Sequence, residues 1–331
     1  MTSTSERPTF KPALRSGQTV LVAGGRGFVG AHIVRALLDA GCHVHVLGPV
    51  MQTDLLADVQ GRFGSVDCGI EDAVAVRTAL TRLAPAAVVV CSAFGSGGEG
   101  LMRASEGDAD QAFAINVDGL RHMASAAREA GVGQVVWTSS TTVYGDASSY
   151  AAGRVDESAP KRPGTLYGLT KHLAEEIGSF AMHRDGFPVI GLRLPLVLGP
   201  GLWYRGAAAA LIAMVRAARP GARHEIAFHN EPIDLMHVRD AAAAVLSVLR
   251  HAGPLAPIYN INGFTARARE IAQALTERVP GFHVDFHEQT PERVFPLIDD
   301  GRFRRDTGFA PQADLQRLIL ETLSTDTGLS P

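Results

Sequence analysis

The sequence contains little cysteine and no long hydrophobic run. Its 331 residues include three cysteines, Cys42, Cys68 and Cys91, without C-x-x-C spacing. An odd number of cysteines so placed is not typical of a disulfide framework, and we expect buried, reduced thiols. No apolar stretch approaches the ~18 residues that a membrane-spanning helix needs, so we expect no membrane partner.

The chain also has little excess of charge of either sign. The chain has 31 Lys and Arg against 34 Asp and Glu, a formal net charge of −3. Nucleic-acid binding requires a concentrated basic face, so we expect no nucleic-acid partner. The 12 histidines form no H-E-x-x-H motif, and we expect no metal site. Residues 1–16 lack the apolar core of a signal peptide, which predicts a flexible N-terminal arm and a cytoplasmic protein.

The sequence does contain a regular alternation of short apolar runs and longer helical segments. The first run, residues 18–23, is apolar and β-branched, as is typical of a strand covered on both faces. Such alternation predicts β-α-β units and an α/β fold with a doubly wound parallel sheet. The predicted strands are residues 18–23, 42–47, 86–91, 134–139 and 189–194, and the predicted helices are residues 29–40, 71–83, 110–130 and 166–184.

The alternation weakens after about residue 199. Helices are expected near residues 206–218 and 238–251, and strands near 224–228 and 256–261. This pattern predicts a smaller C-terminal lobe that is interleaved with the first. The chain is therefore divided into the arm, a main domain over residues 17–199, and a second lobe mainly formed by residues 200–331.

A glycine-rich loop joins the first predicted strand to the first predicted helix. Gly24-Gly25-Arg26-Gly27-Phe28-Val29-Gly30 forms a G-x-x-G-x-x-G motif at that junction. A pyrophosphate needs close backbone approach, which Gly24 and Gly27 permit, and a helix N-terminus that points at it. Gly30 lets the helix lie tightly on the strand. The other interpretation is a glycine-rich turn without a ligand, but the strand–loop–helix context predicts dinucleotide binding by Gly24, Gly27, Phe28, Val29 and Gly30.

The second predicted strand does not decide whether the cofactor carries a 2′-phosphate. An Asp or Glu is expected near Gly48 to hold the adenosine ribose, and neither is there. Arg26 is either a partner for a 2′-phosphate, as in NADP, or a solvated surface arginine. Asp67 ends a third strand-like segment and either contacts the adenine or caps a helix. The cofactor is therefore predicted to be NAD or NADP.

Tyr167 and Lys171 lie four residues apart at the start of a predicted helix, and hence on one face. A free phenol has a pKa of about 10 and is a poor base at neutral pH, but a nearby ammonium favours the phenolate. Tyr167 is thus a candidate acid/base for a substrate hydroxyl. Ser140 follows a predicted strand at the ligand-binding edge of the sheet and is placed to orient the substrate oxygen.

In order and spacing, these motifs resemble the extended short-chain dehydrogenases/reductases, the NAD(P)-dependent epimerase/dehydratase family. The similarity extends from Val20 to Leu323 and includes Asn116 and the segments Thr138–Gly145, Tyr167–Lys171, Leu192–Pro195 and His237–Ala241. It implies a Rossmann-type fold with a C-terminal substrate lobe, and catalytic roles for Ser140, Tyr167 and Lys171.

Further roles follow from the resemblance alone. It implies that Asn116 supports the sheet and the proton network. The turn from Leu194 to Val197 is implied to flank the nicotinamide. It also implies a homodimer that pairs the helices near residues 110–130 and 166–184.

Departures from the family pattern narrow the range of possible substrates and reactions. Sugar-nucleotide dehydratases carry Asp-Glu where this chain has Thr141 and Thr142, so a dehydratase is disfavoured. Nucleotide-sugar enzymes commonly have Asn at Leu196 and Arg at Ile233. These apolar replacements favour a ligand without a diphosphate, unless a cation such as Arg205, Arg239 or Arg293 compensates.

Three functions are therefore considered. The leading hypothesis is an NAD(P)-dependent oxidoreductase that transfers hydride at a secondary hydroxyl or ketone of a small hydroxylated substrate, such as a sugar, sugar acid, polyol or related carbonyl compound. The alternative is a nucleotide-sugar 4-epimerase. A non-catalytic dinucleotide sensor is disfavoured because Tyr167 and Lys171 are both present.

Overall fold

A seven-stranded parallel sheet forms the centre of the molecule. The computed structural model describes residues 13–51, 53–95, 98–203 and 206–325, so most of the predicted N-terminal arm lies outside the described residues. The strand order is β10-β6-β5-β4-β1-β2-β3. These strands are β1 (Thr19–Ala23), β2 (His43–Leu47), β3 (Phe63–Val66), β4 (Ala87–Val90), β5 (Val135–Ser140), β6 (Val189–Leu194) and β10 (Ile258–Asn260).

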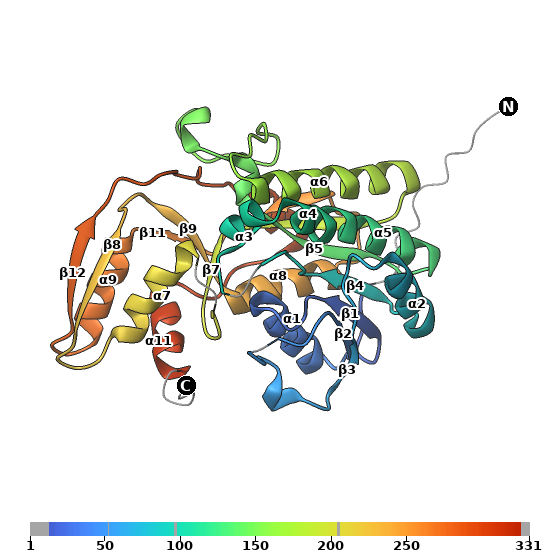
Figure 1. Ribbon diagram of the computed structural model, residues 1–331, viewed down its shortest axis with the longest axis horizontal. Helices are drawn as coiled ribbons and strands as arrows, with labels where there is room; N and C mark the ends of the chain where they lie inside the picture. The colour runs from blue at the N-terminus through green and yellow to red at the C-terminus, as the bar shows by residue number, and fades with distance from the viewer. Residues whose placement is uncertain (1–12, 52, 96–97, 204–205, 326–331) are drawn as a thin grey trace.

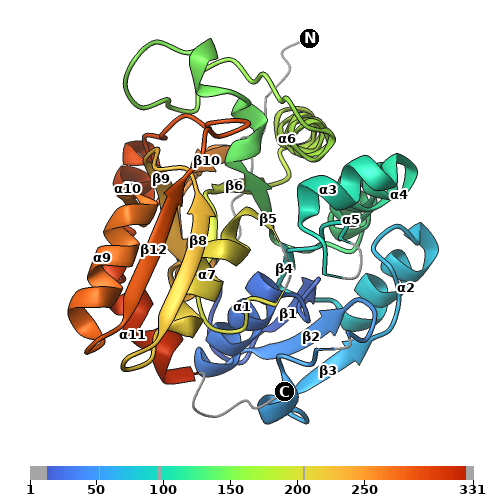
Figure 2. The same cartoon turned by 60° about the vertical axis from the view of Figure 1, so that its left-hand side comes forward.

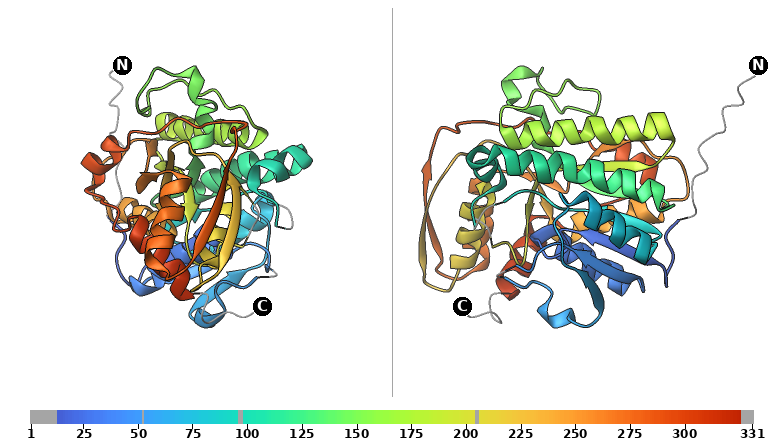
Figure 3. Two further views of the ribbon diagram at one scale, coloured as in Figure 1. Left: turned by 90° about the vertical axis from the view of Figure 1, so that its left-hand side faces the viewer. Right: turned by 45° about the vertical axis from the view of Figure 1, so that its right-hand side comes forward.

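Helices cover both faces of this sheet, because successive residues of a strand point to opposite sides. In β1, Val20 and Val22 join the core layer under α1 (Phe28–Asp39) and α8 (Val238–Arg250). Leu21 and Ala23 join the opposite layer. That layer lies under α2 (Ala73–Leu83), α5 (Gly119–Glu129) and α6 (Leu166–Asp185), which Figure 3 shows stacked on one side. The predicted doubly wound fold is confirmed.

The predicted helix over residues 110–130 is divided by a wider turn. It comprises α4 (Ala109–Phe113), a π-helical turn over Ala114–Asp118, and α5. A short α3 (Leu101–Gly107) precedes it. π-Turns inside helices are common at functional sites because they displace one residue from the regular hydrogen-bond ladder.

Within residues 206–325, the C-terminal lobe has four helices of its own, and the described strands form two small sheets there. One sheet has the order β11-β9-β7 and the other pairs β12 with β8. Figure 2 shows β8, β9 and β12 beside α7, α9 and α11. The strands are β7 (Leu196–Leu198), β8 (Arg223–Phe228), β9 (Ile233–His237), β11 (Phe264–Ala266) and β12 (His283–Glu288), and the helices are α7 (Ala207–Ala217), α9 (Ala268–Arg278), α10 (Gly301–Thr307) and α11 (Leu315–Thr325).

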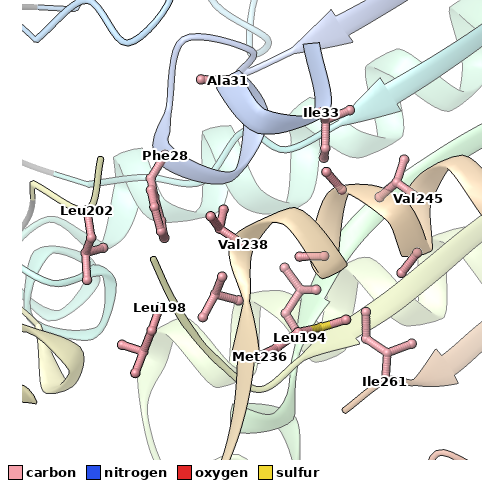
Figure 4. Packing of buried hydrophobic residues seen from close by; sticks show 14 of the residues in the cluster. Phe28, Ala31, Ile33, Leu194, Leu198, Leu202, Met236, Val238, Val245 and Ile261 are labelled. Atoms are coloured by element: carbon pink, nitrogen blue, oxygen red, sulfur yellow. The ribbon is translucent and has the colours of Figure 1, made fainter. Parts of the chain in front are cut away.

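The two lobes are interleaved, as the sequence predicts. β10 leaves the second lobe and pairs in parallel with β6 of the central sheet. α8, which follows β9, packs against α1. Figure 4 shows Phe28, Leu202 and Val238 gathered between the start of α1, the segment after β7 and the start of α8. A common hydrophobic core therefore joins the glycine-loop helix to the second lobe.

Candidate active site

The glycine loop is held by close packing at both ends. Gly24 has φ +76°, and a Cβ there would lie 2.6 Å from the Ser92 backbone nitrogen. A Cβ at Gly30 would overlap the carbonyl oxygen of Gly24. Glycine is thus required at residues 24 and 30 by the fold of the loop itself, in addition to any ligand.

Gly27 differs from the other two glycines. A Cβ there would meet only the Gly24 carbonyl, at 3.3 Å. Gly27 is the N-cap of α1, and neither a side-chain cap nor an acidic residue occupies the first turn of that helix. An uncapped helix N-terminus beside an open glycine backbone fits a pyrophosphate, since orphan N–H groups and the helix dipole both favour an anion.

The other predicted cofactor residues lie on α1, at the end of β6 and on β7. Phe28 begins α1 with its side chain 4 % exposed, and Val29 is partly buried. Leu194 is the last residue of β6 and pairs with Ser140, while its side chain packs in the core shown in Figure 4. Val197 lies buried on β7. Leu194 thus faces the core with its side chain, and only its backbone is available to a ligand.

The predicted adenosine end of the site lies at the carboxyl ends of β2 and β3. Gly48 follows β2 with φ +141°. Arg26 crosses to β3, where its Nη2 donates a hydrogen bond to the Ser65 hydroxyl at 2.8 Å. Its guanidinium lies 5.8 Å from the centre of the Phe63 ring. Asp67 is exposed directly after β3.

Ser140 ends β5 with its hydroxyl oxygen engaged as an acceptor. It accepts hydrogen bonds from the Thr142 backbone N–H at 3.2 Å and from the Thr142 hydroxyl at 3.0 Å. A serine hydroxyl has two acceptor sites and one proton. Because Thr142 fills both acceptor sites, the proton of Ser140 is left to donate to a third group. The sequence interpretation of Thr142 considered only what it lacks and missed this contact.

Tyr167 and Lys171 come together on the first two turns of α6. Thr165 caps this helix by accepting a hydrogen bond from the Gly168 N–H at 3.0 Å. A Cβ at Gly168 would lie 2.6 Å from the Thr142 carbonyl oxygen, so this glycine lets α6 approach the turn after Ser140. The Lys171 ammonium lies 5.7 Å from the centre of the Tyr167 ring. The tyrosine is 8 % exposed and the lysine 2 %.

The Lys171 ammonium is held in a desolvated position. It donates a hydrogen bond to the Thr138 carbonyl oxygen at 2.9 Å and also lies 5.8 Å from the centre of the Trp137 ring. Burial lowers the pKa of Lys171 from its ordinary value of 10.5 to about 8, opposed by the nearby Glu175 carboxylate. Burial also raises the pKa of the Cys91 thiol to about 12. Cys91 is therefore a neutral thiol, and the three cysteines form no disulfide.

Asn116 links two parts of the site from within the π-turn. Its side-chain carbonyl accepts a hydrogen bond from the Phe94 N–H at 2.8 Å, and its amide donates to the Thr170 hydroxyl at 3.0 Å. Thr170 in turn donates to the carbonyl oxygen of Tyr167 at 2.9 Å. Asn116 thus ties the loop after β4 to the helical turn that carries the tyrosine.

A buried ion pair that the sequence interpretation missed lies beneath the site. The fully buried Arg193 makes two hydrogen bonds with Glu175, at 2.8 and 2.7 Å. Ser139 also donates to Glu175, at 2.6 Å. The available signals were a charged residue inside the apolar strand β6 and a glutamate one helical turn after Lys171. This network fixes α6 against β5 and β6.

The cations considered as phosphate partners have different surroundings. Arg239 forms an ion pair with Glu321 at 3.2 Å. Arg293 is half-buried beside Gly164, three residues before Tyr167. Arg205 lies outside the described residues. Leu196 and Ile233 both lie on the small β11-β9-β7 sheet.

Metal ligands and membrane-spanning helices are both missing from the described part of the chain. It contains no cluster of three or more His, Cys, Asp or Glu residues that is arranged to hold a metal ion. None of its helices has the length and apolar character needed to cross a bilayer.

The fold and this geometry define a Rossmann-type α/β protein. The sequence profile of the NAD dependent epimerase/dehydratase family matches residues 20–262. The chain therefore belongs to that family, and its named relatives include a dehydrogenase, a reductase and an epimerase. The resemblance drawn from the sequence motifs is confirmed.

Relatives of known activity include both dehydrogenases and epimerases. The chain is 29% identical to the UDP-glucose 4-epimerase of Streptomyces lividans over 265 residues, which are 75% of this chain and 77% of that enzyme. It is 25% identical to the mitochondrial L-threonine 3-dehydrogenase of Sus scrofa over 236 residues, 68% of this chain and 62% of the pig enzyme.

Solved structures with the same fold also include an epimerase and a dehydrogenase. The Thermus thermophilus UDP-glucose 4-epimerase in complex with NAD superimposes with a TM-score of 0.78 at 25% identity, covering 94% of this chain and 100% of that one. The L-threonine dehydrogenase of Clostridium difficile shares the fold with a TM-score of 0.82 at 17% identity, covering 96% and 100%.

Proposed function

We propose that this protein is an NAD(P)-dependent oxidoreductase acting at a secondary hydroxyl or ketone of a small hydroxylated substrate. The observation that carries the proposal is the buried Lys171 ammonium, 5.7 Å from the centre of the Tyr167 ring and close to the end of β5. A desolvated cation beside a phenol stabilises the phenolate far more than a solvated one does.

The chain's own residues divide the work as follows. Tyr167 takes the proton of the substrate hydroxyl during oxidation and returns it during reduction. Ser140 donates its proton to the same substrate oxygen, because Thr142 occupies its acceptor sites. Lys171 holds the phenolate form of Tyr167 and is close enough to the sheet edge to hydrogen-bond the nicotinamide ribose. When bound, the nicotinamide ring accepts or supplies the hydride.

The two lobes have different proposed tasks. Residues 17–199 bind the dinucleotide through Gly24, Gly27 and Gly30 and carry the catalytic groups. Residues 200–331 mainly bind the substrate. The apolar side chains of Leu196 and Ile233 support a substrate without a diphosphate, because a diphosphate needs cationic partners.

A nucleotide-sugar 4-epimerase is the second candidate. The observation that favours it is Arg293, a half-buried cation on the segment that passes Gly164, close to the start of α6. The similarity to the Streptomyces lividans epimerase supports it as well. A sensor without catalysis remains the third candidate, and the presence of both Tyr167 and Lys171 weighs against it.

The experiment that tests the proposal measures reduced nicotinamide during incubation with a panel of sugars, sugar acids, polyols and hydroxy amino acids. A dehydrogenase accumulates reduced cofactor in step with product. An epimerase given UDP-glucose or UDP-galactose converts the sugar without net change of cofactor. Tyr167→Phe serves as the control and should lower either rate by about a hundredfold or more, the usual size of acid–base catalysis. A full rate in Tyr167→Phe would overturn the assignment.

We also propose a cytoplasmic homodimer. Support for the dimer comes from α6, where Leu169 is 37% and Phe180 59% exposed. Leu173 and Ile177 are partly exposed between them, at helical spacing. Such an apolar stripe on a long helix is typical of a face that a second helix covers.

A further inference from the structure

The carboxyl end of β2 is not followed by an acidic residue that could hold a ribose diol. Leu47 ends the strand, and Gly48, Pro49, Val50 and Met51 follow without an acidic side chain. The first acid after the strand is Asp54, which accepts a hydrogen bond from the Leu56 N–H at 2.9 Å. A dinucleotide-binding fold that selects NAD usually places a carboxylate here, to accept from the 2′-hydroxyl of the adenosine ribose.

A cation occupies this position instead. Arg26 reaches from the glycine loop to Ser65 on β3, at an N···O distance of 2.8 Å. Ser65 pairs in register with Val46, the residue before Leu47, so the guanidinium lies against the end of β2. The Phe63 ring, 5.8 Å away, supports the same guanidinium from the side.

The charge of Arg26 is not neutralised by the protein. Over the described residues no carboxylate pairs with it, and its buried Nε has no hydrogen-bond partner. The neighbouring cations are paired: Arg35 with Asp58 at 2.6 Å, and Arg62 with Asp39 at 3.8 Å. A guanidinium held by a hydroxyl and a ring, with donors left over, is suited to a doubly charged oxyanion.

We propose that Arg26 forms a 2′-phosphate subsite and that the protein selects NADP(H) over NAD(H). The inference rests on the proposed dinucleotide site and adds its selectivity. A 2′-phosphate supplies acceptors for the unused donors of Arg26, whereas the diol of NAD meets a cation there and finds no carboxylate at the end of β2, the nearest acid being Asp67 after β3. Arg26 is a specificity-determining residue and is remote from the reacting atoms.

A purely structural role for Arg26 makes a different prediction. If Arg26 only ties the glycine loop to β3, its loss loosens the loop for every dinucleotide alike. If it binds the 2′-phosphate, its loss affects NADP and spares NAD. The comparison of the two ligands therefore separates the two roles within one variant.

The test is calorimetric titration of the whole protein with NADP, NAD, adenosine 2′,5′-bisphosphate and AMP. We expect the wild type to bind NADP about tenfold or more tightly than NAD, and the bisphosphate more tightly than AMP. Arg26→Ala should weaken NADP about ten- to a hundredfold, the size of a charge-assisted hydrogen bond, and change NAD less than about twofold. Ser65→Ala should lie between. Arg62→Ala, an equal loss of charge on the same lobe, should change neither.

Each outcome bears on the inference. NAD binding equal to or tighter than NADP binding in the wild type would overturn it, as would equal weakening of both ligands in Arg26→Ala. In either case NAD still binds, so the proposed function stands. Failure of the wild type to bind any dinucleotide would remove the proposed function together with this inference. Thermal unfolding of each variant verifies that the fold is intact.

Discussion

Single hydroxyl and ammonium groups decide what the site can do chemically. Ser140 is useful as a donor only because Thr142 satisfies its oxygen from two directions. Lys171 is useful as a cation only while it keeps its proton in a position where water is excluded. Both conditions can be tested by substitution.

Thr142→Val removes one of the two donors to Ser140 and retains a similar shape. The Ser140 hydroxyl then gains the freedom to point its proton away from the substrate. We expect kcat to fall about five- to tenfold, the value of one hydrogen bond, with the Kd for the dinucleotide unchanged. Thr142→Ser should restore the rate. A Thr142→Val enzyme with wild-type kcat would show that Ser140 needs no such support.

Because of Lys171, we expect the free energy of unfolding of the ligand-free protein to vary with pH in the alkaline range. Its pKa is about 8 in the folded protein, against about 10.4 in an unfolded chain. Between these values the unfolded chain holds one more proton than the folded one, so the free energy of unfolding rises with pH. The gain is complete above the unfolded pKa and is lost as pH falls to about 8.

The matched variant is Lys171→Met, which has no proton to exchange. Urea unfolding should be measured at several pH values between 7 and 10. Above pH 8, the free energy of unfolding of the wild type should rise relative to that of the variant by up to about 1.4 kcal/mol per pH unit. Below pH 8 the difference should be constant. Parallel curves over the whole range would mean that Lys171 titrates normally in the folded protein.

At the level of elements, different glycines of the loop serve packing and ligand access. Gly30→Ala places a methyl group against the Gly24 carbonyl and forces α1 away from β1. We expect a loss of about 1–3 kcal/mol in the free energy of unfolding, as in other overpacked sites, together with loss of dinucleotide binding. Gly27→Ala meets only one atom, at 3.3 Å, and should unfold nearly as the wild type while binding at least about tenfold more weakly.

Urea unfolding and dinucleotide titration on both variants measure the two effects. Should Gly27→Ala bind as tightly as the wild type, the pyrophosphate would have to lie elsewhere on the loop.

Elements with a strong local pattern were predicted from the sequence, and contacts between distant residues were not. The apolar runs that became β1, β4 and β5 are buried on both faces, which leaves an unbroken apolar stretch in the sequence itself. The π-turn around Asn116 has no such signal, and the partners of the Asn116 side chain, Phe94 and Thr170, come from other segments.

The ion pair of Arg193 with Glu175 is a similar case. It joins β6 to α6, and neither residue reveals the partner of the other. The motif of Tyr167 and Lys171 predicted which residues share a helix face. It could not predict that the Thr138 carbonyl would receive the lysine, because that contact depends on how α6 lies across β5.

At the scale of the molecule, the apolar stripe on α6 governs association. Phe180→Glu places a charge in its most exposed part. We expect light scattering after size exclusion to show a dimer for the wild type and a monomer for this variant. Val74→Glu, on α2 and 77% exposed, is the matched control and should remain dimeric. A monomeric wild type, or a dimeric Phe180→Glu, would contradict the proposed interface.

The return of β10 to the central sheet has a consequence for how the chain is made. During synthesis the first 199 residues supply six of the seven strands, but β6 is then a bare edge whose backbone groups invite pairing with another chain. Only when Ile258–Asn260 emerges is that edge closed. The nascent protein thus passes through an interval in which its sheet is open to aggregation, and truncation anywhere before Ile258 would make that interval permanent.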